Sequence, residues 1–393
     1  MPGTLLAGDG PAPRGLTAAA RLRIMQTMET KGHFERRASR GVRVGNVAVG
    51  GGAPVSIQSM TNTHTRDAAR TLEQIRRLAA AGCEIVRVAV PAVPDAEALP
   101  DIVRGSPLPV VADIHFSTGL AIRALEAGAA KVRLNPGNID DPEGLRRVIA
   151  LAARLGRPIR FGVNSGSVRG AQQPAGGAAA DSKDLGRLMV DVLMDWVRAA
   201  EKEGFRDLVL SAKASDVYTT VEAYRLLARS CDLPLHLGIT AAGPMDEART
   251  RSAIVLGALL AEGIGDTVRV SLTGDPVSEV VIAQDILAEL GLRPWRGVRI
   301  LSCPTCGRCG VDLIAIVEEL RRRTRSVTAP LTVAVMGCVV NGPGEAREAD
   351  VGIAASKGHG VLFRRGEAVR KVPEAELLDA LLREIRDLAA ERA

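Results

Sequence analysis

Aromatic residues are scarce in this chain. Phe, Tyr and Trp together make up 2% of its 393 residues, too few for the base-stacking surfaces of proteins that bind single-stranded nucleic acid. No uninterrupted apolar run of about 18 residues occurs, which argues against a transmembrane helix. The first residues lack a basic start followed by a clean apolar core, so no signal peptide is expected. The formal net charge of +6 is compatible with an anionic partner.

Cysteine is also sparse for a chain of this length, which excludes a disulfide framework. Four of the six cysteines fall between residues 303 and 338, and this clustering indicates a metal site in a reducing, cytoplasmic compartment. Cys83 and Cys231 stand alone, and we expect both to be small buried hydrophobic residues. Residues 1–35 are rich in Gly, Pro and Ala, which predicts a disordered extension.

A repeating unit begins near residue 53. Each unit has a short β-branched run, a polar turn and an amphipathic segment rich in Ala, Leu and Arg. The predicted strands are 55–60, 85–90, 109–116, 131–136, 158–163, 207–213, 234–240 and 267–272. The predicted helices are 66–81, 117–127, 142–155, 184–203, 216–230, 247–262 and 276–290.

Strands that alternate with helices predict parallel pairing through right-handed crossovers. Eight such units predict a (β/α)₈ TIM barrel of the α/β class over residues 36–296. A doubly wound open sheet is the alternative. The Gly- and Ala-rich segment 164–184 is expected to be either a mobile lid or an unordered connection.

Polar side chains collect where the predicted strands end, which is the active-site face of such a barrel. Buried unpaired cations are costly, so five cations in strands require an explanation. Each could pair with a barrel carboxylate, but only Asp113 stands out as a partner. A pocket for a polyanion explains them better. The candidate residues are Arg87, Asp113, His115, Arg133, Asn135, Arg160, Asn164, Lys213, Arg269 and Ser271.

The periodicity changes after Gly291, and residues 297–393 are predicted to form a small α+β domain. Its "SCPTCGRCG" and "GCVVNGPGE" segments allow three metal sites. Four thiolates could hold zinc, or a ferredoxin-like cluster could use Cys303, Cys306, Cys309 and Cys338. A third site would replace Cys309 with Glu345. Because a carboxylate binds iron more weakly than a thiolate does, Glu345 could leave and expose one iron to substrate. Spacing alone leaves these alternatives open.

Eight segments of the chain match, in the same order, segments of a known enzyme family. The sequence resembles the 4-hydroxy-3-methylbut-2-enyl diphosphate synthases, enzymes of the penultimate step of the methylerythritol phosphate route to isoprenoids. The likeness covers about residues 36–372. The segments are "GGGAPVSIQSMTNT", "VADIHF", "RLNPGNI", "SAKASD", "LHLGIT", "EGIGDTVRVSL", "SCPTCGR" and "GCVVNGPGE".

This resemblance implies a [4Fe-4S] cluster held by Cys303, Cys306, Cys338 and Glu345. The intervals 338 − 306 = 32 and 345 − 338 = 7 equal those of the family, and Cys309 lies outside its pattern. It also implies that a TIM barrel binds a cyclodiphosphate through the strand-end residues Arg87, Arg133, Arg160, Asn164 and Lys213.

The implied reaction is a two-electron reductive ring opening with loss of water. Electrons would come one at a time from a flavodoxin or ferredoxin. The resemblance further implies a homodimer, in which the cluster domain of one chain closes over the barrel of the other.

One position departs from the family. Ala241 stands in "GITAAG", where the family normally has a Glu that handles protons. Asp113, His115 or water would have to substitute for it. A diverged paralogue that reduces another phosphorylated polyol is therefore an alternative function. A non-catalytic iron–sulfur carrier or sensor is a second alternative, but such a protein would not need five strand-end cations.

Overall fold

The computed structural model describes residues 34–172, 182–338, 340 and 342–392, and these form two compact units that divide between Arg293 and Pro294. The extension predicted for residues 1–35 lies outside the described residues, apart from Phe34 and Glu35. No helix in the described residues is long and apolar enough to cross a membrane.

The first unit is a barrel of eight parallel strands, as predicted. Along the sheet the strands follow the order β8-β7-β6-β5-β4-β3-β10-β9, and a parallel bridge between Leu210 and Leu235 joins its two ends. The strands are β3 (Ser56–Met60), β4 (Ile85–Ala89), β5 (Val110–Ile114), β6 (Lys131–Leu134), β7 (Ile159–Asn164), β8 (Leu208–Lys213), β9 (His236–Leu237) and β10 (Thr267–Val268).

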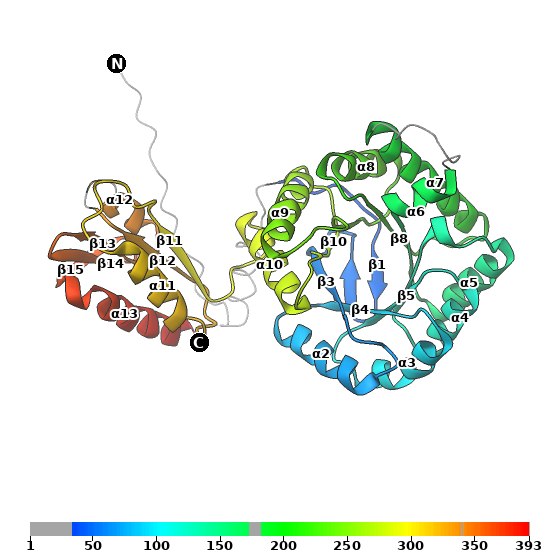
Figure 1. Ribbon diagram of the computed structural model, residues 1–393, viewed down its shortest axis with the longest axis horizontal. Helices are drawn as coiled ribbons and strands as arrows, with labels where there is room; N and C mark the ends of the chain where they lie inside the picture. Colours follow the sequence, from blue (N-terminus) through cyan, green and yellow to red (C-terminus); the bar gives the residue numbers. More distant parts are fainter. Residues whose placement is uncertain (1–33, 173–181, 339, 341, 393) are drawn as a thin grey trace, which may run out of the picture. The chain divides into compact units, whose positions relative to one another are not determined.

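The helices form a ring outside these strands (Figure 1). They are α2 (Ala68–Ala80), α3 (Val93–Gly105), α4 (Thr118–Glu126), α5 (Pro142–Leu155), α6 (Ser165–Gln172), α7 (Ser182–Lys202), α8 (Val217–Ser230), α9 (Met245–Ala261) and α10 (Pro276–Glu289), with a short 3₁₀ turn η1 (Pro136–Asn138) after β6. The sequence analysis missed two helices. One is α3, which has Pro94 in its first turn and carries Pro100 inside it. The other is α6, which occupies part of the segment expected to be a lid or an unordered connection.

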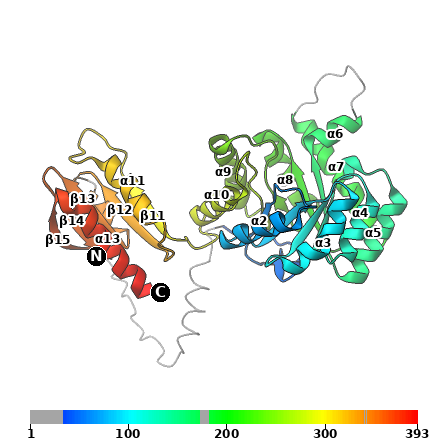
Figure 2. The same ribbon diagram turned by 60° about the horizontal axis from the view of Figure 1, so that its bottom comes forward.

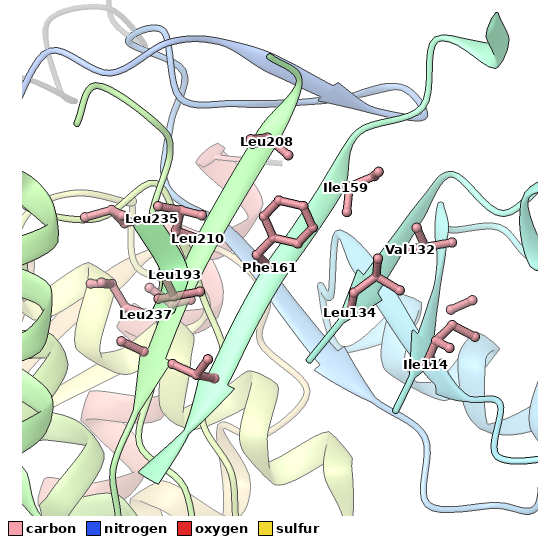
Figure 3. Close-up of a cluster of buried hydrophobic side chains, with 14 of the residues drawn as sticks. Ile114, Val132, Leu134, Ile159, Phe161, Leu193, Leu208, Leu210, Leu235 and Leu237 are labelled. Carbon is pink, nitrogen blue, oxygen red and sulfur yellow. The ribbon is translucent and has the colours of Figure 1, made fainter. Parts of the chain in front are cut away.

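The main core lies between strands and helices because alternate strand residues point outward. Figure 3 shows this layer, where Ile159 and Phe161 of β7 lie beside Leu208 and Leu210 of β8. Phe161 also meets Trp196 of α7 edge-on, with ring centroids 5.2 Å apart. The intervening residues of each strand therefore face the barrel interior.

A short antiparallel hairpin, β1 (Val42–Val44) and β2 (Val47–Val49), precedes the barrel and was not predicted. Gly45 occupies its two-residue turn with φ of 60°, as a type II′ turn requires. Val42, Val44 and Val49 pack against inward-facing residues at the starts of the strands, including Ile85, Val111 and Val209. The hairpin thus closes the amino-terminal end of the barrel with apolar side chains.

The second unit is the predicted α+β domain. Its mixed sheet has the order β11-β12-β13-β14-β15, with β11, β12 and β13 parallel. The elements are β11 (Val298–Ser302), α11 (Leu313–Arg323), β12 (Leu331–Met336), α12 (Gly342–Arg347), β13 (Val351–Ser356), β14 (His359–Arg364), β15 (Glu367–Pro373), η2 (Glu374–Glu376) and α13 (Leu377–Arg392). Helices α11 and α13 cover one face of this sheet, and α12 packs on the other (Figures 1 and 2).

Candidate functional site

The barrel interior presents buried cations from four of its strands. Arg87, Arg133, Arg160 and Lys213 lie on β4, β6, β7 and β8, and all four are buried. They point inward because their strand neighbours, such as Val86, Val132 and Phe161, belong to the outer core. Lys213 ends β8 as predicted from sequence, whereas Arg160 is the second residue of β7 and lies beside Arg133 in register.

Asp113 on β5 is the acid of this cluster. Its Oδ1 accepts a hydrogen bond from Arg133 Nη1 at 3.0 Å, and its Oδ2 lies 3.6 Å from Arg87 Nε. Burial opposes ionisation of the carboxyl, but the charges of Arg87 and Arg133 outweigh this effect and hold the pKa of Asp113 well below its usual value. Asp113 is therefore a carboxylate that orients two guanidinium groups.

His115 follows β5 and reaches the same arginine. Its Nε2 lies 3.0 Å from Arg133 Nη1, and its side chain is 39% exposed. Unlike Asp113, His115 thus has access to solvent while it contacts the cationic cluster. This combination suits a group that exchanges protons.

Arg269 has an acidic partner that the sequence analysis missed. Its Nη2 donates to Glu279 Oε1 at 2.8 Å, and Glu279 also accepts from Ser59 Oγ at 2.9 Å. Glu279 lies on α10 rather than at a strand end, so a search of strand ends could not find it. Its signal was a carboxylate on the apolar side of "PVSEVVIAQDIL".

The expected excess of cations is thereby reduced but not removed. Arg87, Arg133 and Arg269 have carboxylate neighbours, contrary to the expectation that Asp113 was the main one available. Within the described residues neither Arg160 nor Lys213 has a carboxylate at ion-pair distance, and Arg160 Nε and Nη1 have no hydrogen-bond partner. Burial, together with the neighbouring cations, lowers the pKa of both side chains well below its ordinary value.

The predicted neutral donors lie in the loops that follow the strands. Asn135 is buried, and its Oδ1 accepts from Gly137 N at 3.2 Å and from Ser167 Oγ at 3.3 Å. Asn164 ends β7 and is half-buried, and its backbone oxygen accepts from Ser167 Oγ at 2.8 Å. Ser271 is half-buried beyond β10. Asn135 and Ser167 thus tie together the loops after β6 and β7.

In the second unit, the Cys-rich loop and the Gly337–Cys338 segment leave neighbouring parallel strands at the same edge. Cys303 follows β11, and its Sγ accepts a hydrogen bond from Gly337 N at 3.3 Å. Gly310 N donates to Gly337 O at 2.9 Å, which holds the two segments together. Cys306 is exposed in this loop, and Glu345 is exposed on α12.

Cys309 is engaged differently. Its Sγ donates to Val311 O at 3.3 Å, whereas Cys303 Sγ accepts from Gly337 N, and both side chains pack against the core of this domain. A Cβ on Gly337 would lie 2.3 Å from Cys309 Sγ, so this glycine allows a close approach that alanine would not. The thiol of Cys309 thus has a packing role of its own.

The donor types at this edge fit an iron–sulfur cluster, for which thiolates are the usual ligands. Among the described residues, however, no group of three or more His, Cys, Asp or Glu side chains is close enough to hold a metal ion. Val339 and Asn341, which lie between Cys338 and Glu345 in the sequence, are outside the described residues.

Comparison with known proteins covers both units. Residues 39–284 match the GcpE TIM-barrel domain, and residues 299–387 match the GcpE protein C-terminal domain. A protein of Geobacter sulfurreducens is 55% identical over 90% of this chain and 99% of its own length. One of Desulfotalea psychrophila is 48% identical over 91% of this chain and 98% of its own length. Both relatives are named 4-hydroxy-3-methylbut-2-en-1-yl diphosphate synthase (flavodoxin).

Proposed function

The chain belongs to the GcpE family, and we propose that it is an oxidoreductase that opens the ring of 2-C-methyl-D-erythritol 2,4-cyclodiphosphate. The ring opening consumes two electrons and two protons and yields 4-hydroxy-3-methylbut-2-enyl diphosphate and one water. This is a step in the supply of isoprenoid precursors.

The observation that carries the proposal is the excess of buried positive charge in the barrel interior. Arg160 and Lys213 lack carboxylates within the described residues, whereas a substrate with two negatively charged phosphoryl groups would supply the missing counter-charge. Guanidinium groups suit this role because they bind phosphate oxygens in bidentate fashion.

The neighbouring residues then have distinct roles. Asp113 holds Arg87 and Arg133 in place and stays ionised, so it is poorly suited to donate a proton. His115 contacts Arg133 and remains partly exposed, so we assign it the proton-handling role that the family Glu would otherwise fill at position 241. Asn135, Asn164, Arg269 and Ser271 complete the proposed substrate site.

The cluster belongs to the second unit. We propose that Cys303, Cys306, Cys338 and Glu345 would hold a [4Fe-4S] cluster, while Cys309 keeps its packing role. When bound, such a cluster supplies the two electrons one at a time. A flavodoxin is the proposed electron donor, as the names of the relatives state for those proteins, and a ferredoxin is the alternative.

We further propose a cytoplasmic homodimer, in keeping with the family resemblance and with clustered thiols that need a reducing compartment. Light scattering on the purified protein would test the dimer, and a monomer at working concentration would contradict it.

The activity is tested by anaerobic turnover. Protein purified without oxygen should contain about four irons per chain and should convert the cyclodiphosphate when a strong one-electron reductant is supplied. The His115→Gln variant should bind the cyclodiphosphate but turn over more slowly. Full iron content without product would favour a diverged paralogue, and zinc without visible absorption would eliminate the cluster.

A further inference from the structure

A second layer of inward-facing residues lies beneath the proposed substrate site. TIM barrels usually fill this space with branched apolar side chains. Here Lys131 lies two residues before Arg133 on the same face of β6, and Gln58, His236 and Thr267 lie on β3, β9 and β10. All four side chains are almost completely buried.

These polar groups lack partners. Thr267 pairs in register with Ser56, a further buried polar residue of β3, on one side and with His236 on the other. These three residues are therefore neighbours across adjacent strands. At the amino-terminal end of the barrel, Val42, Val44 and Val49 of the hairpin β1–β2 form an apolar cluster with the starts of the strands. Among the described residues of this layer, the side-chain atoms without a hydrogen-bond partner are Lys131 Nζ, Gln58 Oε1 and Nε2, both ring nitrogens of His236, Ser56 Oγ and Thr267 Oγ1.

The charges around Lys131 are mostly of its own sign. Among the described residues, five other cations face this interior, whereas the acids are two, Asp113 and Glu279. Asp113 and Glu279 are already engaged with arginines. The titratable and charged groups that face this interior are Arg87, Asp113, His115, Lys131, Arg133, Arg160, Lys213, His236, Arg269 and, from α10, Glu279.

Lys131 is therefore a poor site for a permanent charge. Burial, followed by the charges of Arg160 and Arg87, holds the pKa of Lys131 well below its ordinary value. Burial, followed by Arg160, Lys213, Lys131 and Arg87, likewise lowers the pKa of His236. Burial without a nearby carboxylate among the described residues thus disfavours the ammonium form of Lys131 in the ligand-free barrel. Any anion that enters above it would reverse this balance.

On the basis of the proposed function, we propose that Lys131 takes up a proton from solvent when a diphosphate dianion binds among Arg87, Arg133 and Arg160. The neutral amine becomes an ammonium because two negative charges now offset the surrounding cations. Lys131 then acts as a positioning residue that completes the counter-charge from below. The bound state holds more protons than the free state. The affinity for the diphosphate should therefore fall as pH rises, by up to about tenfold per pH unit where one proton is taken up.

Isothermal titration calorimetry measures this uptake directly. The full-length, oxidised holoprotein is titrated at one pH in buffers that differ in ionisation enthalpy. The ligands are the cyclodiphosphate and P1,P2-dimethyl diphosphate. Each phosphoryl group of these ligands carries one strongly acidic oxygen, so the ligands themselves exchange no protons near neutral pH. Uptake of close to one proton per site is expected, and Lys131→Met should reduce it by most of that amount. Lys202→Met, at the exposed end of α7, is the matched control and should leave it unchanged.

Two results would overturn the inference. The first is wild-type binding without proton uptake, which decides the matter even if Lys131→Met fails to fold. The second is a folded Lys131→Met variant with undiminished uptake, which would assign the proton to Lys213 or His236. The proposed function fails separately. Proton uptake with dimethyl diphosphate but no turnover of the cyclodiphosphate would refute the activity alone, whereas turnover without uptake would refute the inference alone.

Discussion

Arg133 donates from Nη1 to Asp113 Oδ1 at 3.0 Å, inside a barrel where both side chains are at most 5% exposed. The same carboxylate lies beside Arg87. One acid on β5 thus sets the orientation of cations on both neighbouring strands.

Replacement of Asp113 by Asn should destabilise the barrel by about 3–5 kcal/mol, because it leaves two buried guanidinium groups without their counter-charge. The pKa of Asp113 is lowered in the folded state, so its stabilising contribution is complete above the unfolded pKa of about 3.9 and is lost as pH falls toward the folded pKa. Urea denaturation should therefore show the two proteins converging in stability below about pH 4.

Asp101→Asn provides the control for this measurement. Asp101 lies 3.5 Å from Arg104 in an exposed pair on α3, and its loss should change stability by less than about 1 kcal/mol. An Asp113→Asn variant as stable as this control would contradict the role assigned to Asp113.

Replacement of Arg160 by Met should affect stability and binding in opposite directions. The guanidinium is buried with Nε and Nη1 unpartnered, so an apolar side chain of similar length should maintain or increase the free energy of unfolding. The affinity for the cyclodiphosphate should fall by at least about tenfold, as expected for the loss of a charged hydrogen bond. Calorimetry and denaturation on one preparation test both, and unchanged affinity would exclude Arg160 from the substrate site.

The barrel shows which kinds of residue sequence can locate. All eight strands were predicted because each combines β-branched residues with a following amphipathic helix, and Arg87, Arg133 and Arg160 were conspicuous as cations within such strands. Glu279, the partner of Arg269, was not predicted because it lies on a helix and only tertiary packing brings the two residues together. Helix α3 was missed because Pro100 lies inside it.

The small domain shows a different limit. Its strands, helices α11 and α13 and the Cys-rich loop follow from periodicity, whereas α12 was missed because its Gly and Pro residues are typical of a turn. Spacing also could not distinguish Cys309 from the other cysteines. The contact of Cys309 with Val311 O and its approach to Gly337 depend on how β11 and β12 pair, which the local sequence does not encode. The Gly45 turn was readable as a hairpin signal and was overlooked.

The iron content of cysteine variants distinguishes cluster ligands from the other cysteines. Cys309→Ser should retain about four irons per chain and Cys338→Ser should lose most of them, measured by elemental analysis and visible absorption after anaerobic purification. The reverse pattern would favour a ferredoxin-like ligand set with Cys309 as a member.

The packing of Cys309 against Gly337 is testable by a double-mutant cycle. Gly337→Ala places a methyl group where Cys309 Sγ lies, and it should lower the stability of the small domain by about 1–3 kcal/mol. Because Cys309→Ala removes that sulfur, the double variant should recover much of the loss, with a coupling energy of about 0.5–3 kcal/mol. Simple additivity of the two changes would show that the contact is not the cause.

Ala241 has φ of 51°, a left-handed conformation that is unfavourable for a residue with a Cβ. Ala241→Gly should therefore stabilise the barrel by about 1–2 kcal/mol and leave turnover unchanged. Ala241→Glu keeps the strain and restores a carboxylate, so we expect faster turnover without added stability. Steady-state kinetics beside thermal denaturation distinguish the two effects, and equal rates for all three proteins would show that a carboxylate at this position does not limit the reaction.

Within the described residues, the valine hairpin closes the amino-terminal end of the barrel. Substrate that reaches the arginines would therefore pass the loops that follow the strands, and product would leave by the same route. Water released in the reaction shares that exit. Turnover would then depend on access at this end of the barrel. A partner bound to those loops would slow both substrate binding and product release.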